Sequence, residues 1–196
     1  DVYKRQLLGL SIAIPAGYGF SRYKFYGKSS IMFSFILVQM FPGVIIIVPY
    51  FILMKTLGLL NTSIGLILAY SVTALPLCVW MLNAYFDTIP RELEEAARID
   101  GCSQFQVFWK IIIPLSLPAI AVTSLFSFLA AWNEFLLALT FNTSNDNYTL
   151  PVGLASFISP TKQLWGDFAA LSIIAAIPIV LLFIVSVSYT HLRAHE

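Results

Sequence analysis

Four long apolar stretches with almost no charge constrain this chain most strongly. They cover residues 31–54, 63–83, 114–141 and 167–186, and each has about the 20 residues that a helix needs to cross a bilayer. With 59% hydrophobic and only 11% charged residues, the chain has more apolar surface than a soluble domain could bury. Because the bilayer core offers no water to backbone groups, such spans must be helical. We therefore expect an all-α, polytopic transmembrane helical bundle.

A fifth apolar segment, residues 7–20, is too short to cross a bilayer and is interpreted as the last part of a truncated span, loosened by Pro15, Gly17 and Gly19. The bundle would then have about five membrane segments. Pro42-Gly43 interrupts one full span, and a broken helix of this kind is a candidate pathway or hinge, or more simply a packing kink. Residues 142–166 are predicted to form a long, mostly polar loop.

The distribution of lysine and arginine predicts which side each loop faces. Loops alternate sides along the chain, so residues 21–29 and 85–112 share one side and together hold six basic residues, whereas the opposite loops hold two. The six are Arg22, Lys24, Lys28, Arg91, Arg98 and Lys110, and the two are Lys55 and Lys162. Since the richer side faces the cytoplasm, residues 85–112 are predicted to be cytoplasmic.

Residues 85–112 form a polar island between two spans, and their pattern predicts a helix, a sharp turn and a second helix. Asp87 and Thr88 offer oxygens that can cap the first helix, and Pro90 suits its first turn. Gly101 accepts a positive φ and is a natural end for that helix.

Within the predicted first helix, three carboxylates suit the positive end of the helix dipole: Glu92, Glu94 and Glu95. A small apolar face follows from helical spacing: Leu93, Ala96 and Ala97. Ser103 and Gln106 have the Ser-x-x-Gln form of a capping box, so a second helix should begin there at once.

The spacing in this island resembles the EAA loop of the permease subunits of ABC importers. That family's pattern is Glu-Ala-Ala, three residues, Gly, nine residues, Ile, any residue and Leu-Pro. Here Glu95-Ala96-Ala97, Gly101, Ile111 and Ile113-Pro114 keep the spacing, with Ile113 in place of Leu. The family's loop is a cytoplasmic coupling helix that docks on an ATPase subunit. The resemblance implies ATPase-coupling roles for Glu95, Ala96, Ala97, Asp100, Gly101 and Pro114. The alternative is a generic amphipathic loop of another polytopic protein.

Trp132, Asn133 and Glu134 are candidate substrate-pathway residues because they lie inside the predicted span 114–141. An ionisable side chain at that depth is costly unless it faces a cavity, water or a partner. The Trp132 ring can stack on a sugar ring, and Asn133 and Glu134 can hydrogen-bond hydroxyl groups. An equally weighted alternative is that Glu134 lies near the outer interface and only caps a helix or extends to solvent.

Two further stretches, NYTLPVGL at 147–154 and LWGDFAA at 164–170, resemble sugar-importer permeases. They are most similar to the second permease subunit of maltose and maltodextrin importers. That resemblance covers nearly all of residues 7–186 and implies six spans in the natural protein, the second to the sixth being present here. It also implies the inner membrane of a bacterium or archaeon as the location, and as partners a second permease subunit, an ATPase subunit dimer, an extracytoplasmic solute-binding protein and an oligosaccharide substrate.

No enzymatic, cofactor or metal site is predicted. The chain has no Gly-rich phosphate loop, no nucleophile–base pair and no Cys/His cluster, so ATP hydrolysis is expected in a partner subunit. A net charge of +1 argues against a nucleic-acid partner. Three alternatives stay open: an ABC permease for a non-sugar solute, a secondary transporter driven by an ion gradient, and a membrane scaffold.

Both ends of the chain are similar to translated sequencing adapters of the transposase type. We expect residues 1–6 and 187–196 to be artefactual tails, which leaves residues 7–186 as one ABC importer transmembrane domain truncated at both ends. His191 and His195 then drop out of any functional argument.

Overall fold

Helices account for nearly all of the residues that the structure describes, as the apolar stretches predict. The computed structural model describes residues 2–143, 148–159 and 162–193. Its helices are α1 (Val2–Arg22), α2 (Lys28–Met40), α3 (Gly43–Thr56), α4 (Ser63–Thr88), α5 (Arg91–Ile99), α6 (Gln104–Val107), the π-helical η1 (Phe108–Ile112), α7 (Ile113–Leu115), α8 (Leu117–Trp132), α9 (Leu136–Phe141), α10 (Leu150–Ser156) and α11 (Trp165–Arg193). Two short antiparallel strands, β1 (Ile158–Ser159) and β2 (Lys162–Gln163), connect α10 to α11. The all-α class is confirmed.

The expected spans appear as two single helices and two bent pairs within the described residues. α4 and the 165–184 part of α11 are each long and apolar enough to cross a membrane. α2 and α3 are bent by 103° at Pro42, and the helical segments 104–115 and 117–132 are bent by 73° at Ser116. If each bent pair is one span, the total is four, the number of full spans expected. The second pair does not match its predicted span, because it begins at Gln104, within the polar island, and ends at Trp132. The first break follows from Pro42, which lacks an N–H and forces Phe41 into an extended conformation.

The expected continuous span over 114–141 is wrong. α8 ends at Trp132, and a separate short helix, α9, begins at Leu136. The carboxylate of Glu134 accepts the backbone N–H groups of Leu137 and Ala138 at 2.8 and 3.0 Å, which starts the new helix. The predicted polar loop over 142–166 is also more structured than expected, since it contains α10 and the two strands.

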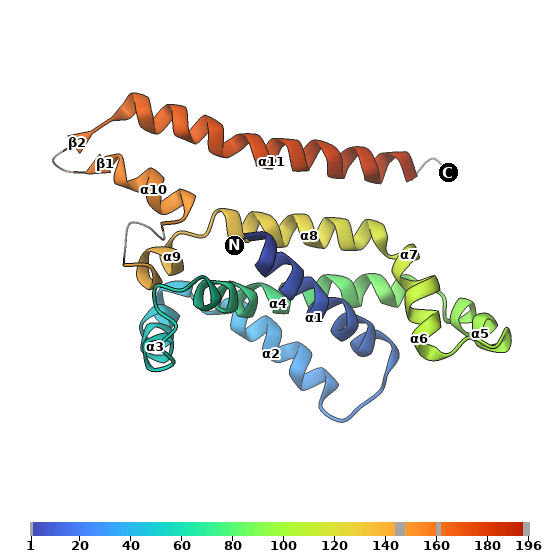
Figure 1. The fold of residues 1–196 in the computed structure, drawn as a ribbon. Helices are drawn as coiled ribbons and strands as arrows, with labels where there is room; N and C mark the ends of the chain where they lie inside the picture. Colours follow the sequence, from blue (N-terminus) through green and yellow to red (C-terminus); the bar gives the residue numbers. More distant parts are fainter. Residues whose placement is uncertain (1, 144–147, 160–161, 194–196) are drawn as a thin grey trace.

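α1 packs along α4 through a stripe of small residues, which corrects the expectation that Gly17 loosens this segment. Ala13, Gly17 and Ser21 recur every fourth residue on one face of an unbroken helix and are all buried. A Cβ at position 17 would lie 3.0 Å from the Cβ of Leu82 on α4. Small residues at this spacing let two membrane helices approach closely. Figure 1 shows the resulting crossing of α1 and α4 at the centre of the molecule.

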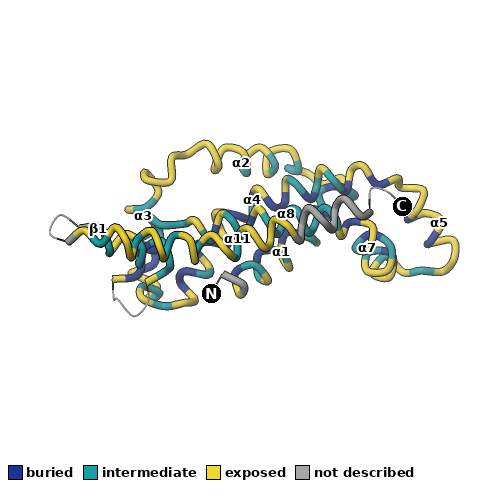
Figure 2. The backbone as a smooth tube through the Cα atoms, turned by 90° about the horizontal axis from the view of Figure 1, so that it is seen from above, coloured by how far each residue is buried: buried dark blue, intermediate teal, exposed yellow. Residues whose placement is uncertain are grey.

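Two hydrophobic clusters lie at the two ends of α4. One joins α1 and the later half of α4 to α5, α6 and η1, with Leu82, Phe86 and Val107 fully buried. The other joins the first half of α4 to α3, α8, α9 and α10, with Ala69 and Ala138 at its centre. By contrast, α2 and α11 expose most of their residues, as Figure 2 shows.

The close approach of α1 and α4 predicts that Gly17→Val destabilises the bundle by about 1–3 kcal/mol, because the added methyl groups overlap Leu82 and the backbone of Asn83. Gly19→Val is the matched control on the same helix, since a Cβ there meets nothing within 4 Å. Thermal unfolding of the two variants in detergent should give a lower Tm for Gly17→Val alone. Equal melting temperatures would contradict the packing role of Gly17.

Candidate functional site

The first helix of the polar island begins later than the cap residues suggested. α4 continues through Asp87 and Thr88, and the Thr88 hydroxyl donates to the carbonyl of Tyr85 rather than capping α5. Ile89 and Pro90 form an extended link, and α5 starts directly after the proline. The reason is that a residue before proline avoids the helical region, so Ile89 ends α4. Pro90, expected in the first turn of α5, instead precedes the helix with ψ 133°, and α5 begins at Arg91.

The turn after α5 has the predicted form. Gly101 has φ +87°, and its N–H donates to Arg98 at 3.1 Å while Cys102 donates to Ala97 at 2.9 Å. These two bonds make a Schellman motif, which satisfies carbonyls at the end of the helix. The capping box is also confirmed: the Ser103 N–H donates to Gln106 Oε1 at 2.8 Å, and the Gln106 N–H donates to Ser103 Oγ at 3.3 Å.

The predicted small face of α5 is divided between the core and the surface. Ala97 is buried against the bundle, whereas Leu93 and Ala96 are exposed. Glu95 is exposed on the same outer side, and Ile99 keeps 86% of its surface accessible. Asp100, Gly101 and Pro114 are exposed as well. α5 therefore presents an outer face with apolar and acidic groups, while a different face anchors it.

That anchor is Glu94, whose role the sequence did not reveal. Glu94 is 2% exposed; the Tyr18 hydroxyl donates to its Oε2 at 2.7 Å, and Arg22 Nε pairs with its Oε1. Arg22, expected in an exposed basic loop, is instead the last residue of α1. The only signal in the sequence was the spacing of Glu94 and Ala97, which places both on one helical face.

Trp132, Asn133 and Glu134 do not point to one place. The Asn133 side chain is exposed and donates to the carbonyl of Leu129 at 3.0 Å. Trp132 stacks on Phe128 and lines a cavity of about 240 Å³. Glu134 caps α9 and lines a second cavity of about 170 Å³.

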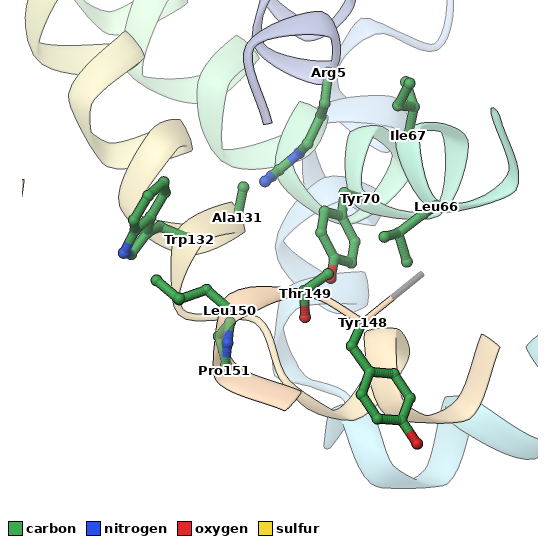
Figure 3. Close-up of a pocket in the computed structure, with 10 residues that line it drawn as sticks. All are labelled: Arg5, Leu66, Ile67, Tyr70, Ala131, Trp132, Tyr148, Thr149, Leu150 and Pro151. Atoms are coloured by element: carbon green, nitrogen blue, oxygen red, sulfur yellow. The ribbon is translucent and has the colours of Figure 1, made fainter. Parts of the chain in front are cut away.

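The Trp132 cavity lies between the start of α4, the end of α8 and the start of α10. Figure 3 shows Tyr70 and Thr149 with their hydroxyl groups close to one another and Trp132 beyond Leu150. Arg5, from the segment 1–6 expected to be an artefactual tail, completes the wall. The cavity offers aromatic surface and hydroxyl groups, the combination that suits a polyhydroxylated solute.

The Glu134 cavity brings together two regions that the sequence treated separately. Gln39, at the end of α2 beside the Pro42 break, lines it together with Thr73 and Ser127. The Gln39 side chain also donates to the carbonyl of Thr73 at 3.3 Å. The broken helix therefore contributes a polar group to the same interior space as Glu134.

The polar island and the Trp132 cavity lie at opposite ends of the bundle, whereas the Glu134 cavity reaches the middle of α4. Figure 1 shows α5 and α6 beyond one end of α4 and α8, while α9, α10 and the strands lie at the other. The structure combines apolar helices long enough to cross a membrane with a helix-turn-helix at one end and the Trp132 cavity near the other. This architecture defines a polytopic helical membrane protein.

Comparison with known proteins identifies the family. A profile described as "Binding-protein-dependent transport system inner membrane component" matches residues 8–195. The chain belongs to this family of inner membrane transport components.

Individual relatives agree with this assignment. The inner membrane ABC transporter permease protein YcjP of Escherichia coli (strain K12) is 37% identical over 180 residues, which cover 92% of this chain and 64% of that protein. The maltose/maltodextrin transport system permease protein MalG of Salmonella typhimurium is 38% identical over 183 residues, covering 90% and 62%. The chain therefore spans slightly less than two thirds of the length of either relative.

A solved structure shows the same fold. The inward-facing MetNI methionine ABC transporter superimposes with a TM-score of 0.75 at 16% identity, over 97% of this chain and 89% of that one.

For a chain that acts as an importer permease, the positive φ at Gly101 predicts that Gly101→Val lowers uptake while leaving membrane insertion intact, since a side chain there costs about 1–2 kcal/mol in the left-handed region. Gly101→Asn is the control, because asparagine tolerates that region better. Uptake and membrane abundance are measured together. Normal uptake by Gly101→Val would show that this turn does not fix the angle of α5.

Proposed function

We propose that this chain is a permease subunit that forms part of the translocation pathway for ATP-driven import of a sugar, and that α5 couples it to a separate ATPase. The exposed outer face of α5 carries this proposal. Glu95 and Ala96 point away from the bundle, and Leu93 and Ile99 leave apolar surface uncovered beside them. An exposed apolar patch with charged neighbours on a membrane protein is typical of a docking surface.

The segment after the Gly101 turn also exposes aromatic side chains, beside α1. Phe105 is 72% exposed and Trp109 is 52% exposed, and their rings contact each other edge to face. Aromatic side chains of this kind dominate the contact energy of protein interfaces. We assign this end of the bundle to the cytoplasm, in agreement with the distribution of basic residues.

The energy source is assigned to a partner subunit. The chain lacks a phosphate-binding loop. An ion-gradient mechanism needs intramembrane ionisable groups that are free to change charge. Glu134 accepts two backbone N–H groups of α9, and this structural task makes it a poor carrier of a coupling ion. Glu134 still lines the cavity with Gln39, so it is retained as a pathway candidate.

A sugar is favoured as the solute. The MalG relative carries maltose and maltodextrin in its name, and the cavity beside Trp132 has the aromatic and hydroxyl groups that a sugar requires. The fold alone does not choose the solute, because the methionine transporter shares it. A non-sugar solute is therefore the second candidate.

The exposed helices and the two ends of the bundle are each assigned to a different partner. α2 and α11 have apolar surfaces that the chain itself does not cover, and we assign them to the bilayer and to a second permease subunit. A solute-binding protein would deliver the sugar at the end that carries α9 and α10, and an ATPase dimer would dock at the end that carries α5.

Docking through α5 predicts that Glu95→Lys abolishes co-purification with the ATPase subunit encoded beside the gene. The lysine would place a positive charge against the positively charged group of the partner that the Glu95 carboxylate is proposed to contact. Asp167→Lys, the same charge change on an exposed residue of α11, should leave co-purification unchanged. Retention of the ATPase by Glu95→Lys would argue against this docking surface. Failure of the unaltered chain to bind any ATPase would argue against an ABC permease altogether.

A sugar pathway beside Trp132 predicts that Trp132→Ala lowers sugar uptake roughly tenfold, the effect of losing about 1.4 kcal/mol of stacking. Trp165→Ala is the control, since Trp165 is exposed at the start of α11 and lines none of the cavities described above. Uptake of radiolabelled sugar and of an amino acid by proteoliposomes separates the two solute classes. Amino-acid uptake without sugar uptake would select the second candidate.

A further inference from the structure

The end of α1 holds α5, the proposed coupling helix, in place although the two are far apart in the sequence. Glu94 and Arg22 form an ion pair whose side chains are 3% and 7% exposed. The Tyr18 hydroxyl donates to the other carboxylate oxygen at 2.7 Å. Both oxygens of Glu94 are therefore engaged by residues of α1, and none of these contacts involves the outer face of α5.

Arg22 also fixes the link through which α4 leads into α5. Its Nη2 donates to the carbonyl of Ile89 at 2.9 Å. That carbonyl lies beyond the end of α4, where helices leave acceptors without partners. One residue further back, Ser21 donates to Asp87 Oδ1 at 2.6 Å. Without these bonds, rotation within the extended Ile89–Pro90 link would swing α5 relative to the bundle.

The connection that leaves α5 is held by the same helix. Gln104, the first residue of α6, donates through Nε2 to the Tyr18 hydroxyl at 2.6 Å. Tyr18 also packs against Phe86 of α4 and Phe108 of η1, with ring centroids 5.8 and 4.9 Å apart. α1 therefore contacts the segment before α5, α5 itself and the segment after it.

We propose that Tyr18, Arg22 and Glu94 form a clamp that stays closed throughout the transport cycle and makes α1 move with α5 as one body. This inference rests on the proposed coupling of α5 to an ATPase. The clamp remains closed because opening it would leave a carboxylate and a guanidinium buried without partners. Arginine suits the position because its planar fork reaches Glu94 and Ile89 together, which a lysine ammonium cannot do with the same geometry.

In this arrangement Glu94 and Glu95, neighbours in the sequence, have different tasks. Glu95 faces outward and contacts the ATPase, whereas Glu94 faces inward. When the ATPase displaces α5, Glu94 passes that displacement to α1. Because α1 and α4 approach closely at Gly17, the displacement reaches the centre of the bundle. Tyr18, Arg22 and Glu94 are positioning residues, since they act through α5.

The first test measures solute moved per ATP hydrolysed by the chain assembled with its ATPase and second permease subunit in proteoliposomes. Glu94→Gln and Arg22→Lys keep a similar side-chain size but weaken the clamp, because glutamine has one acceptor oxygen instead of two and lysine lacks the planar fork of Arg22. We expect ATP hydrolysis to persist while the ratio of solute moved to ATP hydrolysed falls about tenfold. Losing one charge-assisted hydrogen bond shifts the equilibrium between closed and open clamp by about that factor. Glu92→Gln, which removes an exposed carboxylate from the same helix, should leave the ratio unchanged.

A merely stabilising role would lower the amount of assembled transporter and leave the ratio of the remainder intact. An unchanged ratio in Glu94→Gln, beside a wild-type assembly that couples normally, would overturn the clamp and leave the proposed function standing. A wild-type assembly without any ATP-dependent uptake would overturn both.

The second test asks whether the clamp stays closed. Arg22→Cys and Glu94→Cys are introduced together after Cys78→Ala and Cys102→Ala remove the other thiols. Removing both charges at once leaves no unpaired buried ion, so this variant should assemble. Bridging the two thiols with a short bifunctional reagent should raise uptake above that of the unbridged variant. If bridging instead stops uptake, the two positions must separate during transport, and the proposal fails.

Discussion

The close approach of α1 and α4 at Gly17 is the contact on which the rest of the structure depends. Because Gly17 has no side chain, α1 can lie against Leu82 and the backbone of Asn83. This places Tyr18, which follows Gly17, and Arg22, at the end of α1, within reach of Glu94 on α5. In a bilayer, where lipid is as apolar as the helices, such packing is a main source of helix association.

The buried ion pair at the end of α1 is better understood as a device for position than as a source of stability. Taking two charges out of water costs nearly as much as their attraction returns, whereas removing one partner alone costs about 3–5 kcal/mol. The pair is therefore tolerated as long as it stays intact and is strongly penalised when it opens. That asymmetry makes it a suitable connection between two helices that must keep one orientation.

Local rules predicted much of the polar island and of the class of fold. The turn at Gly101 and the capping box at Ser103 depend on residues within one helical turn of each other, so the sequence was sufficient to find them. The break at Pro42 was equally visible, because proline acts on its own backbone. The start of α5 was misplaced because Asp87 and Thr88 have the right side chains for a cap, but Pro90 decided the boundary.

The features that the sequence did not predict all depend on distant partners. Nothing near Glu94 indicates that Tyr18 and Arg22 lie against it, and nothing near Glu134 separates a pathway carboxylate from a residue that begins a helix. Gln39 and Glu134 line one cavity only because the end of α2 and the link after α8 both lie beside the same part of α4. A single sequence carries periodicity and spacing, but the pairing of buried polar groups is set by the way helices cross.

In the coupling role proposed for α5, a helix must satisfy two opposed requirements, and the nine residues of α5 meet both. It needs exposed surface for a partner, and it must also be fixed firmly enough to transmit a push. Successive residues of an α-helix are about 100° apart around its axis, so Glu94 and Glu95 point in different directions although they are chemically identical. The inward carboxylate binds the end of α1 and the outward one remains available. Because the anchor and the docking surface share one rigid turn, movement of one cannot be absorbed before it reaches the other.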